Sequence, residues 1–185
     1  MTTSDGPIRE VYVQPGESHL VERPTMLSTV LGSCVGVTFL VPRLGIGALC
    51  HPMLPQCPEN RLAKLGKACR QRYVDLAIRD MAGALDVLGA VRAEVKVKLF
   101  GGGDVLAVGE DSLRPTIGKL NWESALRVLE EEGLTVAALR PGGSTGVHIQ
   151  FKTGTGEVLL RRLDSASAIR FRDVTRVPNH VRTRR

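Results

Sequence analysis

The chain has 185 residues, of which 43% are hydrophobic and only 4% aromatic, and its net charge is +6. This length predicts a single domain whose core is built from aliphatic side chains. The scarcity of aromatic residues argues against a single-strand nucleic-acid binder, which needs aromatic platforms for base stacking. No apolar run approaches the ~20 residues of a membrane span, and the N-terminus lacks the pattern of a secretory signal. We therefore expect a soluble, cytoplasmic protein.

The positive charge is confined to the C-terminal end. Residues 161–185 hold eight arginines against Asp164 and Asp173, whereas the remaining 17 basic and 17 acidic residues balance. We therefore divide the chain into a folded domain, residues 10–163, and a basic, arginine-rich tail, residues 164–185. The tail is interpreted either as a solvated, partly disordered terminus or as a tether to an acidic partner or anionic surface.

In chain order, the first strong prediction is a β-hairpin, which follows two short strands at residues 10–14 and 26–31. Residues 35–41 (VGVTFLV) are an apolar, β-branched run typical of a buried strand, and residues 46–50 (IGALC) form the return strand. The connection is a turn at Pro42–Gly45. Because Cys34 precedes the first strand and His51 follows the second, the hairpin is expected to bring both side chains to the same end.

Helices and further strands follow. Residues 61–88 carry the apolar spacing of a core-facing helix that ends at Gly89, and Asn121 is a good N-cap for a helix over residues 122–132. Strands are predicted at 93–100, 134–139, 147–152 and 157–163. Strands outnumber helices and many are joined by short turns. The predicted fold class is therefore α/β of the α+β type: a single-domain layered sandwich of mixed or antiparallel sheet with helices packed on the outer faces.

Cys34 and His51 are the candidate reactive residues. A thiolate is a strong nucleophile, and a neighbouring imidazole can take the thiol proton and later give it to a leaving group. Gly32 and Ser33 form a tight turn before the cysteine, and the backbone N–H groups of such a turn could serve as an oxyanion hole. Spacing alone leaves the structural alternative open, since buried cysteines are common in apolar strands.

No cofactor is predicted. The four cysteines at positions 34, 50, 57 and 69 include no C-x-x-C pair of the kind that holds zinc, so they are expected to be free thiols and the metal site is predicted as none. The glycine run at 101–103 lacks the continuation of a phosphate-binding loop. Gly102 and Gly103 are instead expected to let the backbone pass close to the active-site turn or the substrate, with structural packing as the alternative.

Several segments, taken in order, resemble one family. LGSCVGV with a histidine seventeen residues after its cysteine in GALCHPMLP, then RYVDLAIRDM, KLFGGGDVL and IGKLNWESALRVLEEEG, closely resemble the chemoreceptor glutamine deamidases, the CheD family of bacterial and archaeal chemotaxis. The resemblance covers residues 11–163. It implies a cysteine-hydrolase-like protein that converts glutamine side chains of methyl-accepting chemotaxis receptors to glutamate and releases ammonia.

The resemblance also implies residue roles and a partner. Cys34 matches the family's nucleophile and His51 its base, while the third member is a hydroxyl residue just upstream, Thr29 or Ser28, of which the residue type favours Thr29. No metal or organic cofactor is required. In the family a phosphatase of the CheC type binds the deamidase by mimicking its substrate, so a similar regulator is implied here.

Two other functions stay open. The turn in LRPGGSTGVHI departs from the family, which usually has an acidic residue before the glycine pair and an arginine after it. This departure favours a non-catalytic adaptor of the same fold that binds receptors or a chemotaxis phosphatase. A thioester on Cys34 could also pass its acyl group to an amine, as a transglutaminase does.

Overall fold

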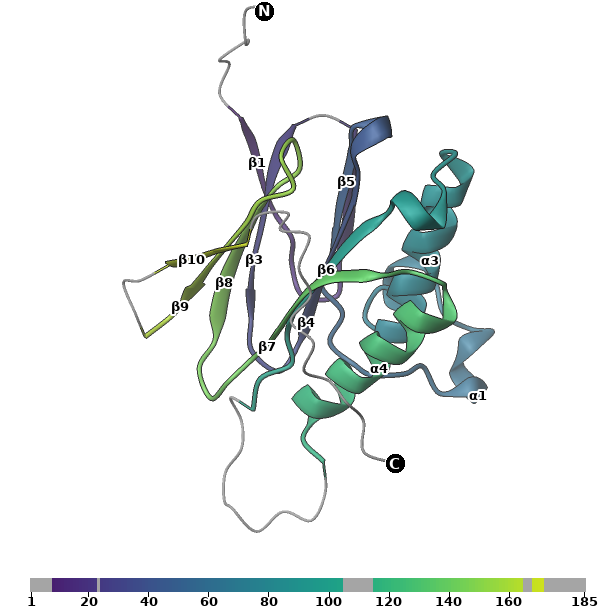
Figure 1. The fold of residues 1–185 in the computed structure, drawn as a ribbon. Coiled ribbons are helices and arrows are strands. Elements are labelled where there is room, and N and C mark those ends of the chain that lie inside the picture. Colours follow the sequence, from purple (N-terminus) through teal and green to yellow (C-terminus); the bar gives the residue numbers. More distant parts are fainter. Residues whose placement is uncertain (1–7, 23, 105–114, 165–167, 172–185) are drawn as a thin grey trace, which may run out of the picture.

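The computed structural model of the protein describes residues 8–22, 24–104, 115–164 and 168–171. Two five-stranded sheets lie face to face, and two long helices cover the outer face of one of them, so that the described chain forms three layers (Figure 1). This arrangement confirms the predicted layered sandwich of the α+β type. Within the described ranges the long helices pack on one outer face, whereas the prediction placed helices on the outer faces of the sandwich.

Both sheets are mixed, as predicted. The first has the order β1-β3-β8-β9-β10, with strands Arg9–Tyr12, Thr25–Leu31, Val147–Lys152, Val158–Arg162 and Ala168–Phe171. The second has the order β2-β5-β4-β6-β7, with strands Ser18–Val21, Ile46–Cys50, Val35–Val41, Lys96–Gly101 and Val136–Pro141. One edge pair of each sheet is parallel, β1 with β3 and β6 with β7, and the other pairs are antiparallel.

The second sheet is the middle layer, and its central β4–β5 hairpin is the one predicted from the sequence. Every residue of both strands is buried, which explains why they read as continuous apolar runs and do not alternate. Leu40 and Leu49 contribute to the core between the two sheets. Phe39 and Cys50 belong to the other core, which lies between this sheet and the helices.

Helices α3 (Val74–Val87) and α4 (Ile117–Glu131) cover the middle layer. Their apolar faces are buried in the core, and Arg79 of α3 ties the two helices together on the outside through Glu131 and Glu132. The short helices α1 (Glu59–Leu62) and α2 (Lys67–Arg70) lead into α3, and two 3-10 turns, η1 (Pro42–Leu44) and η2 (Arg92–Glu94), complete the described helices.

Some local predictions were wrong. The helix predicted over residues 61–88 is broken into α1, α2 and α3, with Gly66 in an extended conformation before α2. Helix α4 begins at Ile117, so Asn121 is not its N-cap. Thr116 caps it, and the Thr116 hydroxyl accepts a hydrogen bond from the Lys119 N–H at 3.2 Å. Asn121 is instead turned toward other segments, as described below.

Strand β10 falls in the range assigned to the basic tail, and it pairs with β9 in the first sheet. The sheet therefore continues beyond Leu163. The remainder of the tail, residues 165–167 and 172–185, lies outside the described residues, so both interpretations of the tail stay predictions. Strand β2 was also not predicted, because SHLV has no distinctive strand pattern.

Candidate active site

Cys34 lies in the turn that leads from β3 into β4. The register of the hairpin pairs Val37 with Cys50, and the Val35 N–H donates to the Pro52 carbonyl at 3.4 Å. The chain just after Cys34 therefore runs directly beside the chain just after His51. The structure brings the two predicted reactive residues to the same end of the hairpin.

The Cys34 thiol is half-buried beside the core between the sheets. This burial raises its pKa above its ordinary value of 9.0, and the residue's own backbone N–H opposes the shift only in part. Near neutral pH the side chain is therefore a protonated thiol. It needs a base at the moment of attack, because a thiol is a far weaker nucleophile than a thiolate.

His51 is held rigidly at the end of β5. Its ring and backbone are 1% exposed, its N–H donates to the Glu17 carbonyl at 2.9 Å, and its own carbonyl accepts from the Gly16 N–H at 2.7 Å. Burial lowers the pKa of His51 from 6.5 to about 4, opposed in part by the Val13 carbonyl. The imidazole is therefore neutral near pH 7, which is the form that can accept a proton.

A buried hydroxyl orients this imidazole. Thr29 Oγ1 lies 2.7 Å from the Val13 carbonyl oxygen and 2.7 Å from His51 Nδ1. The carbonyl can only accept, so the single hydroxyl hydrogen points to Val13 and Thr29 Oγ1 accepts the hydrogen on Nδ1. Nε2 then carries the free lone pair. Ser28 lies on the opposite face of β3, since burial alternates along the strand.

The glycine run after β6 braces the cysteine turn. The Gly102 N–H donates to the Cys34 carbonyl at 2.8 Å, and the Gly103 N–H donates to the Gly32 carbonyl at 3.0 Å. Both N–H groups are therefore engaged with the turn, and the glycine run lies directly beside it. No backbone carbonyl of a described residue accepts a hydrogen bond from the N–H groups of Ser33 and Cys34, so these donors of the turn are available to a substrate oxygen.

Asn121 is the residue at this site that the sequence did not reveal. It lies on α4, is completely buried, and its Nδ2 donates to the carbonyls of Ser33 and Met53, both at 2.9 Å. These carbonyls belong to the cysteine turn and to the segment after the histidine. The sequence offered one signal, a polar residue on the buried side of an amphipathic helix, but it fitted an N-cap equally well.

The other cysteines do not share this setting. Cys50 is adjacent to His51 in sequence, yet it is completely buried on the helix side of the sheet, where burial raises the pKa of its thiol to about 12. Cys57 is buried and Cys69 is exposed. The described residues contain no cluster of His, Cys, Asp and Glu that could hold a metal ion, and no described helix is long and apolar enough to cross a membrane.

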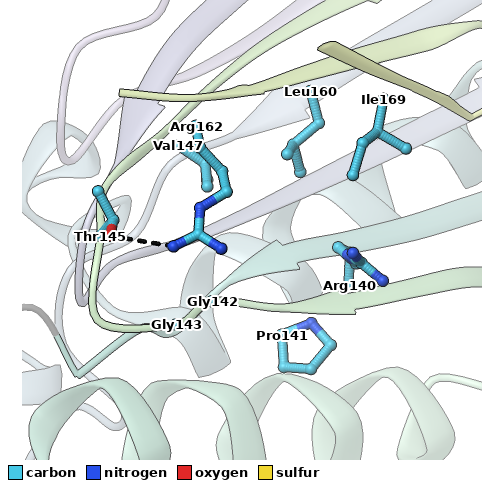
Figure 2. A pocket seen from close by; sticks show the side chains of 9 residues that line it. All are labelled: Arg140, Pro141, Gly142, Gly143, Thr145, Val147, Leu160, Arg162 and Ile169. Carbon is cyan, nitrogen blue, oxygen red and sulfur yellow. Dashed lines mark hydrogen bonds between the residues drawn. The ribbon is translucent and has the colours of Figure 1, made fainter. Parts of the chain in front are cut away.

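A cavity of about 200 Å³ lies next to Gly142 and Gly143, whose flanking residues differ from the pattern that the sequence resemblance implies, and Figure 2 shows its lining. It is lined by Arg140, Pro141, Gly142, Gly143, Thr145, Val147, Leu160, Arg162 and Ile169. The Arg162 guanidinium donates to the Thr145 hydroxyl at 3.2 Å. Neither Cys34 nor His51 lines this cavity, so it neighbours the candidate active site and is separate from it.

The comparisons with known proteins agree with one another. The family model described as CheD chemotactic sensory transduction matches residues 53–162. A relative from Geobacter sulfurreducens, named probable chemoreceptor glutamine deamidase CheD 2, is 40% identical over 168 residues, which cover 91% of this chain and 99% of the relative. The chain belongs to the CheD family.

Other CheD proteins extend this finding. A probable chemoreceptor glutamine deamidase CheD from Maridesulfovibrio salexigens is 35% identical, covering 89% of this chain and 98% of its own. One from Pseudomonas fluorescens is 38% identical, covering 82% and 84%. Among solved structures, the Bacillus licheniformis hypothetical protein YfiH is similar with a TM-score of 0.44 at 14% identity, covering 76% of this chain and 60% of that one. A likeness this distant decides nothing about the CheD chain.

Proposed function

We propose that this chain is a cytoplasmic protein-glutamine deamidase that hydrolyses glutamine side chains of methyl-accepting chemotaxis receptors to glutamate and ammonia through a Cys34 thioester. The observation that carries the proposal is the buried hydrogen bond from His51 Nδ1 to Thr29 Oγ1, at the hairpin end where Cys34 also lies. It supports a base with a defined tautomer beside a nucleophile. The names of the CheD relatives support the choice of substrate.

In the proposed first half-reaction, His51 Nε2 takes the Cys34 proton as the sulfur attacks the carboxamide carbon. Support comes from the protonation states, since the pKa of the thiol is raised and the pKa of the imidazole is lowered by burial. The resulting imidazolium keeps its Nδ1–H on Thr29. The oxyanion accepts hydrogen bonds from the backbone N–H groups of the Gly32-Ser33-Cys34 turn, a role for which preorganised donors are well suited.

To complete this first half-reaction, the imidazolium gives its proton to the nitrogen of the tetrahedral intermediate. The C–N bond breaks, ammonia leaves, and the acyl group stays on sulfur as a thioester. In the second half-reaction, a water molecule attacks the thioester carbon while His51 takes a proton from the water. The C–S bond then breaks, and His51 returns the proton to the sulfur, which restores the thiol. The sum is carboxamide plus water giving carboxylic acid plus ammonia, so no other reactant is needed.

The proposal includes a receptor segment with exposed glutamines as substrate and a regulator of the CheC phosphatase type as partner. Both rest on membership of the CheD family. A pull-down with a purified CheC-type phosphatase tests the partner. If the phosphatase is a substrate mimic, an excess of receptor fragment should displace it from the deamidase.

Incubation of the purified chain with a receptor cytoplasmic fragment in ¹⁸O-labelled water tests the reaction, with the glutamines mapped by mass spectrometry. Hydrolysis is expected to produce glutamates that carry one ¹⁸O atom each, and Cys34→Ala is expected to abolish them. Cys69→Ala is the matched control, because this cysteine is exposed and makes none of the contacts described for the candidate site. Activity retained by Cys34→Ala would exclude the thioester mechanism.

The same experiment separates the alternatives. An adaptor would bind the fragment without converting any glutamine, and an acyl transferase would incorporate an added primary amine in place of labelled oxygen. The main reason to consider an adaptor was the altered glycine turn. In the structure the Gly142 N–H donates to the Gly101 carbonyl at 2.6 Å, so this turn still packs on the segment that braces Cys34.

A further inference from the structure

Helix α4 carries a buried polar face where an apolar one is expected. Gly118, Asn121 and Ser124 follow one another at intervals of three residues and are all buried, whereas the later buried residues of the helix are Ala125, Val128 and Leu129. Residues three apart lie on the same face of a helix. Near its start α4 therefore presents Gly118 to the glycine run and Asn121 to the segments beside Cys34 and His51. Ser124 lies further along the same face, and the last turns present apolar groups to the core.

Gly118 shows how closely this face approaches. A side chain at Gly118 would overlap the carbonyl oxygens of Gly103 and Gly102. The helix therefore lies directly on the glycine run whose N–H groups bind the cysteine turn. One turn further along, Asn121 reaches the catalytic segments themselves.

Asn121 joins the two catalytic segments through one atom. Its Nδ2 has two hydrogens, and both are donated, one to the carbonyl of Ser33 and one to the carbonyl of Met53. Ser33 immediately precedes Cys34, and Met53 is two residues after His51. A second link between these segments, the hydrogen bond from the Val35 N–H to the Pro52 carbonyl, is long at 3.4 Å.

The acceptor end of this amide is unusual. Because two carbonyls can only accept, the amide must present its nitrogen to them, and its orientation is fixed. Asn121 Oδ1 is then buried, and no described residue donates to it. An unsatisfied buried acceptor costs free energy. If position 121 served packing alone, an apolar side chain of similar size would fill it at lower cost.

We propose that Asn121 is a positioning residue, which sets the Cys34 sulfur against His51 Nε2 by holding the carbonyls of Ser33 and Met53. Its relevance to catalysis rests on the deamidase function proposed above. Asn121 does not touch the reacting atoms. It fixes the separation of two loops whose relative position determines whether the thiol proton can be transferred during attack.

Two substitutions test this. Asn121→Ala removes the two hydrogen-bond donors. Asn121→Asp keeps the shape of the side chain but places a carboxyl oxygen against the two carbonyl oxygens in place of the donating nitrogen. In the receptor-fragment assay both are expected to lower kcat by about 10- to 100-fold, while KM changes by less than about threefold, since small displacements of reacting groups act on the chemical step. Ser124→Ala is the matched control: it removes the bond from the Ser124 hydroxyl to the Pro55 carbonyl at 2.5 Å on the same helix face.

Thermal unfolding of the three variants separates positioning from folding. Ser124→Ala loses one side-chain hydrogen bond, whereas Asn121→Ala loses two but also removes an unsatisfied buried acceptor, so we expect the two variants to lower the unfolding midpoint by similar amounts. Ser124→Ala is nevertheless expected to keep kcat within about twofold of the wild type. A loss of kcat that simply followed the loss of stability in all three variants would overturn the proposal. So would an Asn121→Asp variant with wild-type kcat.

Alkylation by iodoacetamide gives a readout that does not depend on the substrate. The raised pKa of Cys34 means that its reaction near pH 7 depends on proton transfer to His51, whereas exposed Cys69 in the same molecule serves as the reference. Asn121→Ala is expected to lower the rate of Cys34 relative to Cys69 by about tenfold. An unchanged ratio would refute the positioning role. If Asn121→Ala lowers the ratio but the wild type converts no glutamine, the positioning role stands and only the proposed function is refuted.

Discussion

At one end of the β4–β5 hairpin, the Cys34 turn and His51 are held by buried hydrogen bonds and close backbone contacts. At the other end, the Pro42–Gly45 connection is held by Arg43, which is exposed and binds Glu94 and the Gly89 carbonyl. Both ends belong to the same two paired strands, β4 and β5. We therefore expect each end to tolerate substitution according to how that end is closed, and not according to the stability of the hairpin as a whole.

The largest expected effect is at the buried end, where His51→Gln removes the base. We expect kcat for deamidation of the receptor fragment to fall by about 10³-fold or more, since catalytic groups that act as a unit lose most of their effect together. His19→Gln is the control, because the ring of this half-buried histidine hydrogen-bonds to Glu17 and to none of the described candidate-site residues. If His51→Gln kept a tenth of wild-type activity, another group would have to be the base.

A pair of glycines compares the two ends directly. Gly101 and Gly45 both have positive φ, 90° and 66°. A methyl group on Gly101 would overlap the Cys34 carbonyl oxygen, whereas one on Gly45 would meet only the Glu22 carbonyl oxygen at 3.8 Å. Left-handed strain costs each alanine about 1–2 kcal/mol, and the overlap adds about 1–3 kcal/mol to Gly101→Ala alone.

Urea unfolding measures this difference, and the deamidase assay follows it. Gly101→Ala is expected to lose more stability than Gly45→Ala and also to lose activity, because the cysteine turn must move. Equal losses of stability in the two variants would mean that the two ends are equally constrained, and the comparison would fail.

Thr29→Val tests the orientation of the base. Without the hydroxyl, the His51 Nδ1–H loses its acceptor, and kcat is expected to fall about 10- to 100-fold, as for other partners that orient a catalytic imidazole. Thr29→Ser retains a hydroxyl and is expected to recover most of the activity. Ser28→Ala tests the alternative left open by the sequence. A loss in Ser28→Ala as large as in Thr29→Val would transfer the role to Ser28.

These residues mark the limit of prediction from the sequence. The hairpin and its shared Cys34–His51 end could be predicted, because apolar runs and a Pro–Gly connection are local signals. The contacts that complete the site are not local: Asn121 bonds across 88 and 68 positions, and the Val13–Glu17 segment closes over His51. Such contacts depend on how the layers pack, so the helix-end position predicted for Asn121 was plausible but wrong.

The pH dependence of activity is the next prediction. Since burial lowers the pKa of His51 to about 4, kcat/KM should stay flat from about pH 5 to 8 and fall tenfold per unit below about pH 4, where the base is protonated. An acid limb near 6.5 would indicate a solvated imidazole. The same shift affects stability: the unfolded chain binds the proton first, so stability should decline as the pH falls from 6.5 toward 4.

The smallest effect is expected at the exposed end. Arg43→Ala removes bonds of 2.6–2.8 Å to Glu94, but both partners are accessible to solvent, so the thermal midpoint should fall by less than about 2 °C and the difference should shrink in high salt. Arg43 lowers the pKa of Glu94 to about 2, so this contribution is present above 4.5 and disappears as the pH approaches 2. Differential scanning calorimetry at two pH values measures this contribution to stability.

Deamidation should be unchanged, because the buried end holds Cys34 and His51 without help from Arg43. A twofold or greater loss of kcat in Arg43→Ala would show that the strands transmit strain between the two ends.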